Sequence, residues 1–198
     1  MKAKAILSLV LPVAALLATG CVSVQKSSSE HHAHADAKAH AGGWAAMNHA
    51  VAVIYPTAGN QCSGIVRFQQ TGDTVKVVAE ISGLKPNQAH GFHIHEFGDA
   101  SATNGLATGG HYNPEGHAHA LPNTGTRHAG DFGNLQADAS GNARMEITVA
   151  NISIAGLRNP VLGRGVIVHA NPDDGSQPVG NAGPRIGQGV IGLAKSTD

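Results

Sequence analysis

The sequence is poor in cysteine, in aromatic residues and in net charge. It has 2 cysteines among 198 residues, aromatic residues make up 4% of it, and 13 basic residues balance 13 acidic ones. Lys2 and Lys4 lie in the predicted signal peptide described below, and without them 11 basic residues face 13 acidic ones, a formal charge of −2. This balance argues against nucleic acid or an anionic surface as a partner.

Long apolar runs are also scarce, and the run from Ala5 to Leu17 is too short to span a bilayer. It follows the positive charges of Lys2 and Lys4, so residues 1–20 are predicted to be a secretory signal peptide. Small residues directly before Cys21 resemble the bacterial lipobox, although Ala18 stands where Leu is commoner. We therefore expect an exported protein of the bacterial periplasm or cell envelope, anchored to a membrane through a lipid on Cys21. Simple secretion is the alternative.

Residues 21–46 have the composition of a flexible linker. Serine, alanine, glycine and charged residues dominate this segment, which cannot bury enough apolar surface to fold. It is rich in histidine, with His31, His32, His34 and His40 close together. The linker either loads metal or is only a polar spacer, and the sequence leaves both open. Residues 47–198 have the length of one domain.

Within this domain, alternating apolar residues and turn signals predict strands and no helix. Glycine is abundant, as tight turns between short strands require. The predicted fold is all-β: an eight-stranded antiparallel Greek-key β-barrel or sandwich with two long functional loops. The predicted strands are 50–55, 63–69, 74–82, 89–97, 132–139, 143–150, 164–170 and 187–193. The fifth and sixth are expected to pair as a hairpin around residues 140–142.

The two long loops, residues 98–131 and 171–185, have almost no strand character, and loops of such length are usually functional. Before the first loop stands GFHIHEFGD, residues 91–99. On a strand, His93 and His95 share one face and Phe92 and Ile94 take the other, and Phe97 follows them in the sequence. Two histidines spaced in this way, without other ligands nearby, are more often structural than metal-binding.

The residues that follow change that judgement. The first loop contains His111, His117, His119, His128 and Asp131, and the strand 164–170 ends in His169. Neutral imidazoles with one carboxylate suit zinc and copper. Because no cysteine lies among them, a structural zinc site built on thiolates is excluded.

Five motifs together resemble the copper/zinc superoxide dismutase family over about residues 50–195: GFHIHEFGD, GGHYNP, RHAGD, VHA followed by Asp173, and GNAGPRIGQGVIG. The resemblance implies a copper site and a zinc site that share one histidine. The implied copper ligands are His93, His95, His111 and His169, and the implied zinc ligands are His111, His119, His128 and Asp131. Asp173 would hydrogen-bond one ligand of each metal, and Arg185 would stand at the mouth of the copper channel. His49, His90 and His117 match no ligand position.

The resemblance also implies the activity, which is dismutation of superoxide to dioxygen and hydrogen peroxide. Arg185 and His111 are then the catalytic residues, Arg185 by attracting the anion and His111 by passing a proton to the product. One alternative is a copper or zinc carrier on the same fold without significant catalysis. Another is a catalytically silent member of the family.

The chain departs from the family pattern at the two positions of its disulfide. Gly105 and Gln188 stand where the family has cysteines, so no disulfide is expected. Cys62 is then a buried small residue, a free thiol or an intermolecular partner. Residues 173–185 contain no Lys or Glu, so that loop lacks the family's charged rim. Residues 189–192 resemble a segment used in dimers, which favours a homodimer.

Overall fold

The computed structural model describes residues 47–195. The predicted signal peptide, the lipidation site at Cys21 and the histidine-rich linker therefore lie outside the described residues. No helix in the described part of the chain is long and apolar enough to cross a membrane.

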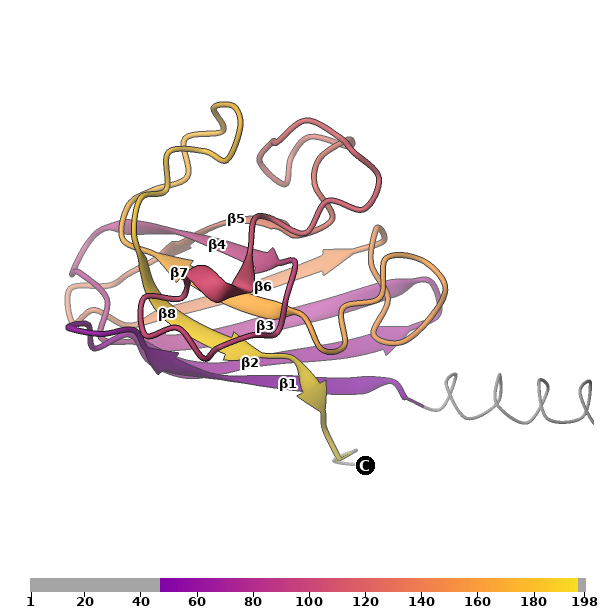
Figure 1. Ribbon diagram of the computed structural model, residues 1–198, viewed down its shortest axis with the longest axis horizontal. Coiled ribbons are helices and arrows are strands. Elements are labelled where there is room, and N and C mark those ends of the chain that lie inside the picture. Colours follow the sequence, from indigo (N-terminus) through magenta and orange to yellow (C-terminus); the bar gives the residue numbers. More distant parts are fainter. Residues whose placement is uncertain (1–46, 196–198) are drawn as a thin grey trace, which may run out of the picture.

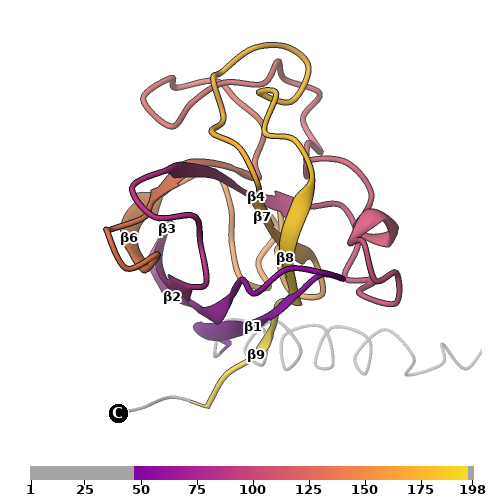
Figure 2. The same ribbon diagram turned by 90° about the vertical axis from the view of Figure 1, so that its left-hand side faces the viewer.

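The described residues form an antiparallel sheet that curls into a nearly closed barrel (Figure 2). Neighbouring strands follow the order β5-β4-β7-β8-β1-β2-β3-β6, and the short β9 pairs with β1. The strands are β1 His49–Pro56, β2 Ser63–Thr71, β3 Thr74–Ser82, β4 Ala89–His95, β5 Asp131–Gln136, β6 Ala143–Val149, β7 Gly165–His169, β8 Arg185–Val190 and β9 Gly192–Leu193. The all-β prediction is confirmed, and the one helical element from residue 47 to 195 is the 3₁₀ turn η1 Leu106–Thr108.

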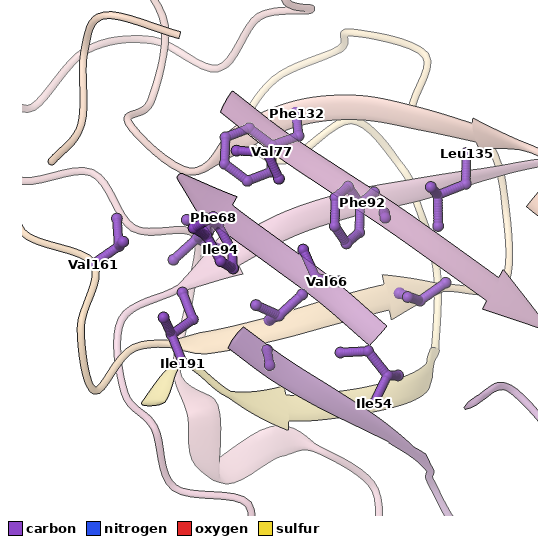
Figure 3. Close-up of a cluster of buried hydrophobic side chains, with 14 of the residues drawn as sticks. Ile54, Val66, Phe68, Val77, Phe92, Ile94, Phe132, Leu135, Val161 and Ile191 are labelled. Atoms are coloured by element: carbon purple, nitrogen blue, oxygen red, sulfur yellow. The ribbon is translucent and has the colours of Figure 1, made fainter. Parts of the chain in front are cut away.

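Strand alternation fills the interior of the barrel. Val75, Val77, Ala79 and Ile81 on β3 are buried, while Lys76 and Glu80, which alternate with them, face solvent. Phe92 and Ile94 on β4 pack into the same interior as Phe68 and Phe132 (Figure 3). Each large apolar side chain removed from water in this way contributes about 1.5–3 kcal/mol to stability.

The predicted hairpin of the fifth and sixth strands is wrong. The chain does turn at residues 138–142, where Asn142 O accepts a hydrogen bond from Asp138 N at 2.8 Å. Beyond the turn, however, β5 pairs with β4 and β6 pairs with β3. The two strands diverge because each finds its ladder partner elsewhere, and they form the two edges where the barrel stays open.

Two strand ends also differ from the prediction. The last predicted strand divides at Ile191, so β8 pairs with β7 whereas β9 pairs with β1. The predicted strand 89–97 stops at His95, and Phe97, two residues beyond it, is 56% exposed. Phe97 lies past the last strand residue, where strand alternation no longer fixes the direction of a side chain.

The two long loops rise from the same side of the barrel in both views (Figures 1 and 2). They cover the outer face of β4, whose residues 90–95 are therefore buried on both sides of the sheet. Polar side chains on the outer face of this strand are consequently removed from water. Each of these buried polar side chains needs a hydrogen-bond partner or a bound ion, and the groups that supply such partners form the candidate site.

Candidate metal centre

The outer face of β4 and the two long loops bring four histidines together. His93 and His95 come from β4, His169 from the end of β7, and His111 from the first loop, which a bridge to His95 holds against β4. One ring nitrogen of each of the four lies within 4.8 Å of those of the others. We call this the four-histidine group.

A second cluster lies beside it and shares His111. It consists of His111, His119, His128 and Asp131, again with one possible ligand atom each within 4.8 Å of one another. Asp131 Oδ1 is 3.0 Å from His111 Nδ1 and 3.2 Å from His128 Nδ1, and Asp131 Oδ2 is 2.9 Å from His119 Nδ1. We call this the His₃Asp group. With Nδ1 of His111 turned to Asp131, its Nε2 is left for the four-histidine group.

The residues fit metal ions because each ring has one anchored nitrogen and one that is left over. His95 Nδ1 donates to Gly109 O at 2.9 Å and His169 Nδ1 donates to Gly183 O at 3.0 Å. A carbonyl oxygen only accepts, so in the neutral ring the other nitrogen carries a lone pair. Within the two groups, four buried ring nitrogens make no hydrogen bond to the described residues: His93 Nδ1, His95 Nε2, His169 Nε2 and His119 Nδ1, the last of which only contacts Asp131 Oδ2. His90 Nε2, which lies outside both groups, is a fifth. Buried, unprotonated ring nitrogens that point toward a common centre are suited to bind a metal ion there.

Burial keeps these rings in the neutral form that binds metal. Desolvation lowers the pKa of His93 to about 4 and that of His169 to about 3, despite hydrogen bonds that oppose the shift. It also lowers the pKa of His95 and His111. At neutral pH protons therefore do not compete with a cation for these nitrogens.

Comparison with known proteins gives the family. Residues 62–191 match the family model described as copper/zinc superoxide dismutase. The chain belongs to the copper/zinc superoxide dismutase family. It is 45% identical over 140 residues to a superoxide dismutase [Cu-Zn] of Paramecium bursaria Chlorella virus 1, a match covering 67% of this chain and 73% of the relative. It is 45% identical over 158 residues to superoxide dismutase [Cu-Zn] 3 of Arabidopsis thaliana, covering 75% and 93% of the two chains.

The chain is accordingly a superoxide dismutase that uses copper and zinc to convert superoxide to dioxygen and hydrogen peroxide. The family match supports the hypothesis of an enzyme over the alternative of a metal carrier without catalysis. The eight residue positions that the resemblance assigned to metals, with His111 counted twice, are the same residues that the fold gathers into the two groups.

Asp173 links the two groups of this dismutase from outside. Its Oδ2 accepts from His93 Nε2 at 2.8 Å and its Oδ1 accepts from His119 Nε2 at 2.9 Å. Burial alone would raise the pKa of Asp173, but the hydrogen bonds from both rings outweigh it and hold that pKa well below its usual range. A permanently charged carboxylate fixes both rings so that their free nitrogens point into the groups.

Asn134 on β5 holds Asp173 in turn, a role that no motif in the sequence indicates. Asn134 Nδ2 donates to Asp173 O at 2.8 Å, and Asp173 N donates to Asn134 Oδ1 at 2.7 Å. This reciprocal pair ties the second loop to a rigid strand. A single asparagine inside a strand carries no motif, so only the fold reveals its role.

Arg185 begins β8 and lies beside the four-histidine group. Its Nη2 donates to Gly109 O at 2.6 Å, the same carbonyl that accepts from His95 Nδ1. Its Nη1 donates to Gly105 O at 2.6 Å and to Thr108 Oγ1 at 2.9 Å. Three hydrogen bonds therefore aim a half-buried guanidinium that contributes to lowering the pKa of both His95 and His169.

The remaining histidines of the described domain lie outside both groups. His90 is buried and its Nδ1 donates to His169 O at 2.8 Å, so it supports the end of β7. His117 is partly exposed, with Nδ1 3.4 Å from Glu115 Oε2. His49 starts β1 and contacts Asn48.

Cys62 is the only cysteine in the described part of the chain, and it is free and fully buried. Burial raises the pKa of its thiol to about 12, so the reactive thiolate is not formed near neutral pH. The structure therefore favours the first of the three roles considered for it, that of a small buried residue. The first loop is held to the barrel without a covalent crosslink.

We predict that metal replaces the missing crosslink in stabilising this protein. His111, His119, His128 and Asp131 all belong to the first loop or its end, so one ion would clamp the whole segment. An ion bound at a thousandfold excess over its dissociation constant contributes about 4 kcal/mol, which corresponds to a melting temperature higher by roughly 10 °C. Calorimetry of metal-loaded and metal-free protein measures this difference, and proteolysis reports on the loop.

Dithiothreitol should leave the melting temperature of the metal-loaded protein unchanged. A metal-free protein that melts as high as the loaded one would refute the clamp. A large drop with reductant would instead reveal a disulfide through Cys62.

Proposed function

We propose that the four-histidine group holds the catalytic copper, that the His₃Asp group holds the zinc, and that Arg185 guides superoxide to the copper. The observation that carries this proposal is the position of Arg185, which shares the carbonyl of Gly109 with His95. A fixed cation beside one group marks that group as the place where an anion arrives.

The donor sets agree with this assignment. Copper changes oxidation state whereas zinc does not, so the metal that meets the substrate is copper. The His₃Asp group offers three imidazoles and one carboxylate, a set that suits tetrahedral zinc.

When bound, copper supplies one electron to superoxide or takes one from it. The residues of the chain then do the rest. Arg185 is always charged and presents its donors as a planar fork, so it binds and orients the anion. His111 would take up a proton from solvent at Nε2 and donate it to the departing peroxide, and solvent would supply the second proton of hydrogen peroxide. Its Nδ1 stays turned to Asp131, which keeps the ring in place during this transfer.

Arg185→Glu tests the proposal. Reversing the charge that meets the anion should lower the second-order rate constant by roughly tenfold or more, because electrostatic steering becomes repulsion. Copper content should change little, because Arg185 is in neither group. The measurements are superoxide decay by pulse radiolysis and elemental analysis of the same sample.

Arg67→Glu is the matched control for this variant. Arg67 is exposed on β2 and pairs with Glu80 at 3.7 Å. The variant therefore changes the net charge by the same amount as Arg185→Glu, but at a place away from the histidines. Its rate should stay close to that of the unsubstituted enzyme. Equal rates for both variants would remove Arg185 from the mechanism.

We further propose that the enzyme is exported from a bacterial cell and anchored to a membrane of its envelope through Cys21. The support is the order of a basic start, a short apolar run and small residues before Cys21. An enzyme in this place meets superoxide that arises outside the cytoplasm. Residues 21–46 then act as a tether between the anchor and the barrel.

Cys21→Ala tests the anchor. In a bacterial host, the unsubstituted protein should incorporate labelled palmitate and sediment with membranes, whereas the variant should do neither while remaining active. Cys62→Ala is the control and should keep both the label and the membrane association. An unlabelled protein in the soluble periplasmic fraction would favour simple secretion.

We also propose a homodimer formed through an exposed apolar patch. The patch consists of Val53, Tyr55, Phe97 and Val190, which come from β1, from the end of β4 and from β8, and which are between 39% and 64% exposed. Val190 lies close to Gly98, the neighbour of Phe97. Apolar side chains gathered in this way on a soluble domain favour contact with a second copy.

Phe97→Glu should turn a dimer into a monomer, because association would then bury an unpaired charge. Sedimentation velocity at micromolar concentration measures the change. Leu157→Glu, which alters a fully exposed leucine outside the patch, is the control and should leave the dimer intact. A monomer before any substitution would contradict the proposal.

A further inference from the structure

A nearly buried glutamine on β8 joins this strand to the first loop. Gln188 is 7% exposed, and its Nε2 donates to Ala102 O at 3.1 Å and to Ala100 O at 3.4 Å. Its Oε1 is buried and has no hydrogen-bond partner within residues 47–195. It lies 3.6 Å from where a Cβ on Gly105 would stand, so the side chain fills the space between the loop and the strand.

The segment that Gln188 holds has few other anchors. Five of the six residues from 99 to 104 are exposed, and none belongs to the hydrophobic core. Besides the two bonds from Gln188, a backbone bond from Ala58 N to Thr103 O at 2.7 Å ties this segment to the barrel. Segments with few buried apolar contacts open at low free-energy cost, so the amide of Gln188 has a large share in ordering this one.

A short chain of hydrogen bonds leads from Gln188 to Arg185. The carbonyl of Ala102 accepts both from Gln188 Nε2 and from Gly105 N, the latter at 3.0 Å. The carbonyl of Gly105 accepts from Arg185 Nη1 at 2.6 Å. A displacement of residues 100–105 therefore moves one of the three acceptors that aim the guanidinium.

We infer that Gln188 is a positioning residue for Arg185, in that its amide holds the carbonyls of residues 100–105 where they orient the guanidinium toward the four-histidine group. The inference rests on the proposed role of Arg185 in binding the anion. Positions 105 and 188 are those at which the sequence lacks the family's disulfide. The hydrogen bonds of Gln188 thus hold the loop at the place where the resemblance would put a disulfide.

Azide titration of the copper- and zinc-loaded full-length enzyme tests this inference. Azide is a small anion whose binding changes the absorption spectrum of oxidised copper, so its dissociation constant reports on anion binding without catalysis. Gln188→Met keeps the volume of the side chain, removes both donors and adds no charge. The dissociation constant for azide should rise roughly threefold or more, because small misplacements of a binding group are costly.

Gln70→Met is the matched control. Gln70 donates to Gly72 O at 2.8 Å and accepts from Ile154 N at 2.9 Å, all at a hairpin turn and a loop that contain none of the site residues. Both variants should melt at a lower temperature, but only Gln188→Met should bind azide more weakly. Lower stability with unchanged azide affinity and rate in Gln188→Met would overturn the inference.

Arg185→Met distinguishes the inferred role of Gln188 from the proposed role of Arg185 in binding the anion. If Arg185→Met leaves azide affinity unchanged, the proposed role of Arg185 is wrong and the inference falls with it. If Arg185→Met weakens azide binding while Gln188→Met does not, only the role of Gln188 is wrong. If both weaken it, the double variant should bind azide no more weakly than Arg185→Met alone, because the two residues act through one guanidinium.

Discussion

The site depends on one repeated interaction, a hydrogen bond from one ring nitrogen that turns the other nitrogen inward. His95 and His169 donate to backbone carbonyls, while His93 and His119 donate to the carboxylate of Asp173. None of these acceptors can give a proton back, so the tautomer of each ring is fixed before any ion arrives. Because the acceptors lie on loops that hydrogen bonds tie to the strands, the directions of the rings are fixed as well.

Two carboxylates divide the work of holding these rings. Asp131 lies within the His₃Asp group and contacts three of its rings directly, whereas Asp173 lies outside both groups and contacts one ring of each. The two groups are also joined by His111, which belongs to both. Any shift of Asp173 or His111 therefore displaces side chains of both groups, so the two groups are coupled through these residues.

The barrel and the clustering of the histidines were largely predictable because both leave local patterns in the sequence. Alternation in β3 and β4 identifies the inner and outer faces, and motifs with fixed spacing identify the clustered histidines. The pairing of β5 with β4 and of β6 with β3 was not predictable, because the turn at residues 138–142 reads like a hairpin and distant ladder partners leave no local mark. The roles of Asn134 and Gln188 were not predictable either, because single polar residues acquire their partners only when the loops fold back onto the strands.

Gly109 shows most directly how the fold joins Arg185 to the four-histidine group. Its carbonyl accepts from both His95 and Arg185, so one backbone atom places a ring of that group and the guanidinium together. Gly109 has φ of 76°, and a Cβ there would lie 2.8 Å from Phe97 Cδ2. A side chain at this position would meet backbone strain, and relief of that strain would move the shared carbonyl, whereas the contacts with Glu96 and Phe97 could be relieved by those exposed side chains. The need for glycine at position 109 therefore follows from the distance that must be kept between the guanidinium and the ring of His95.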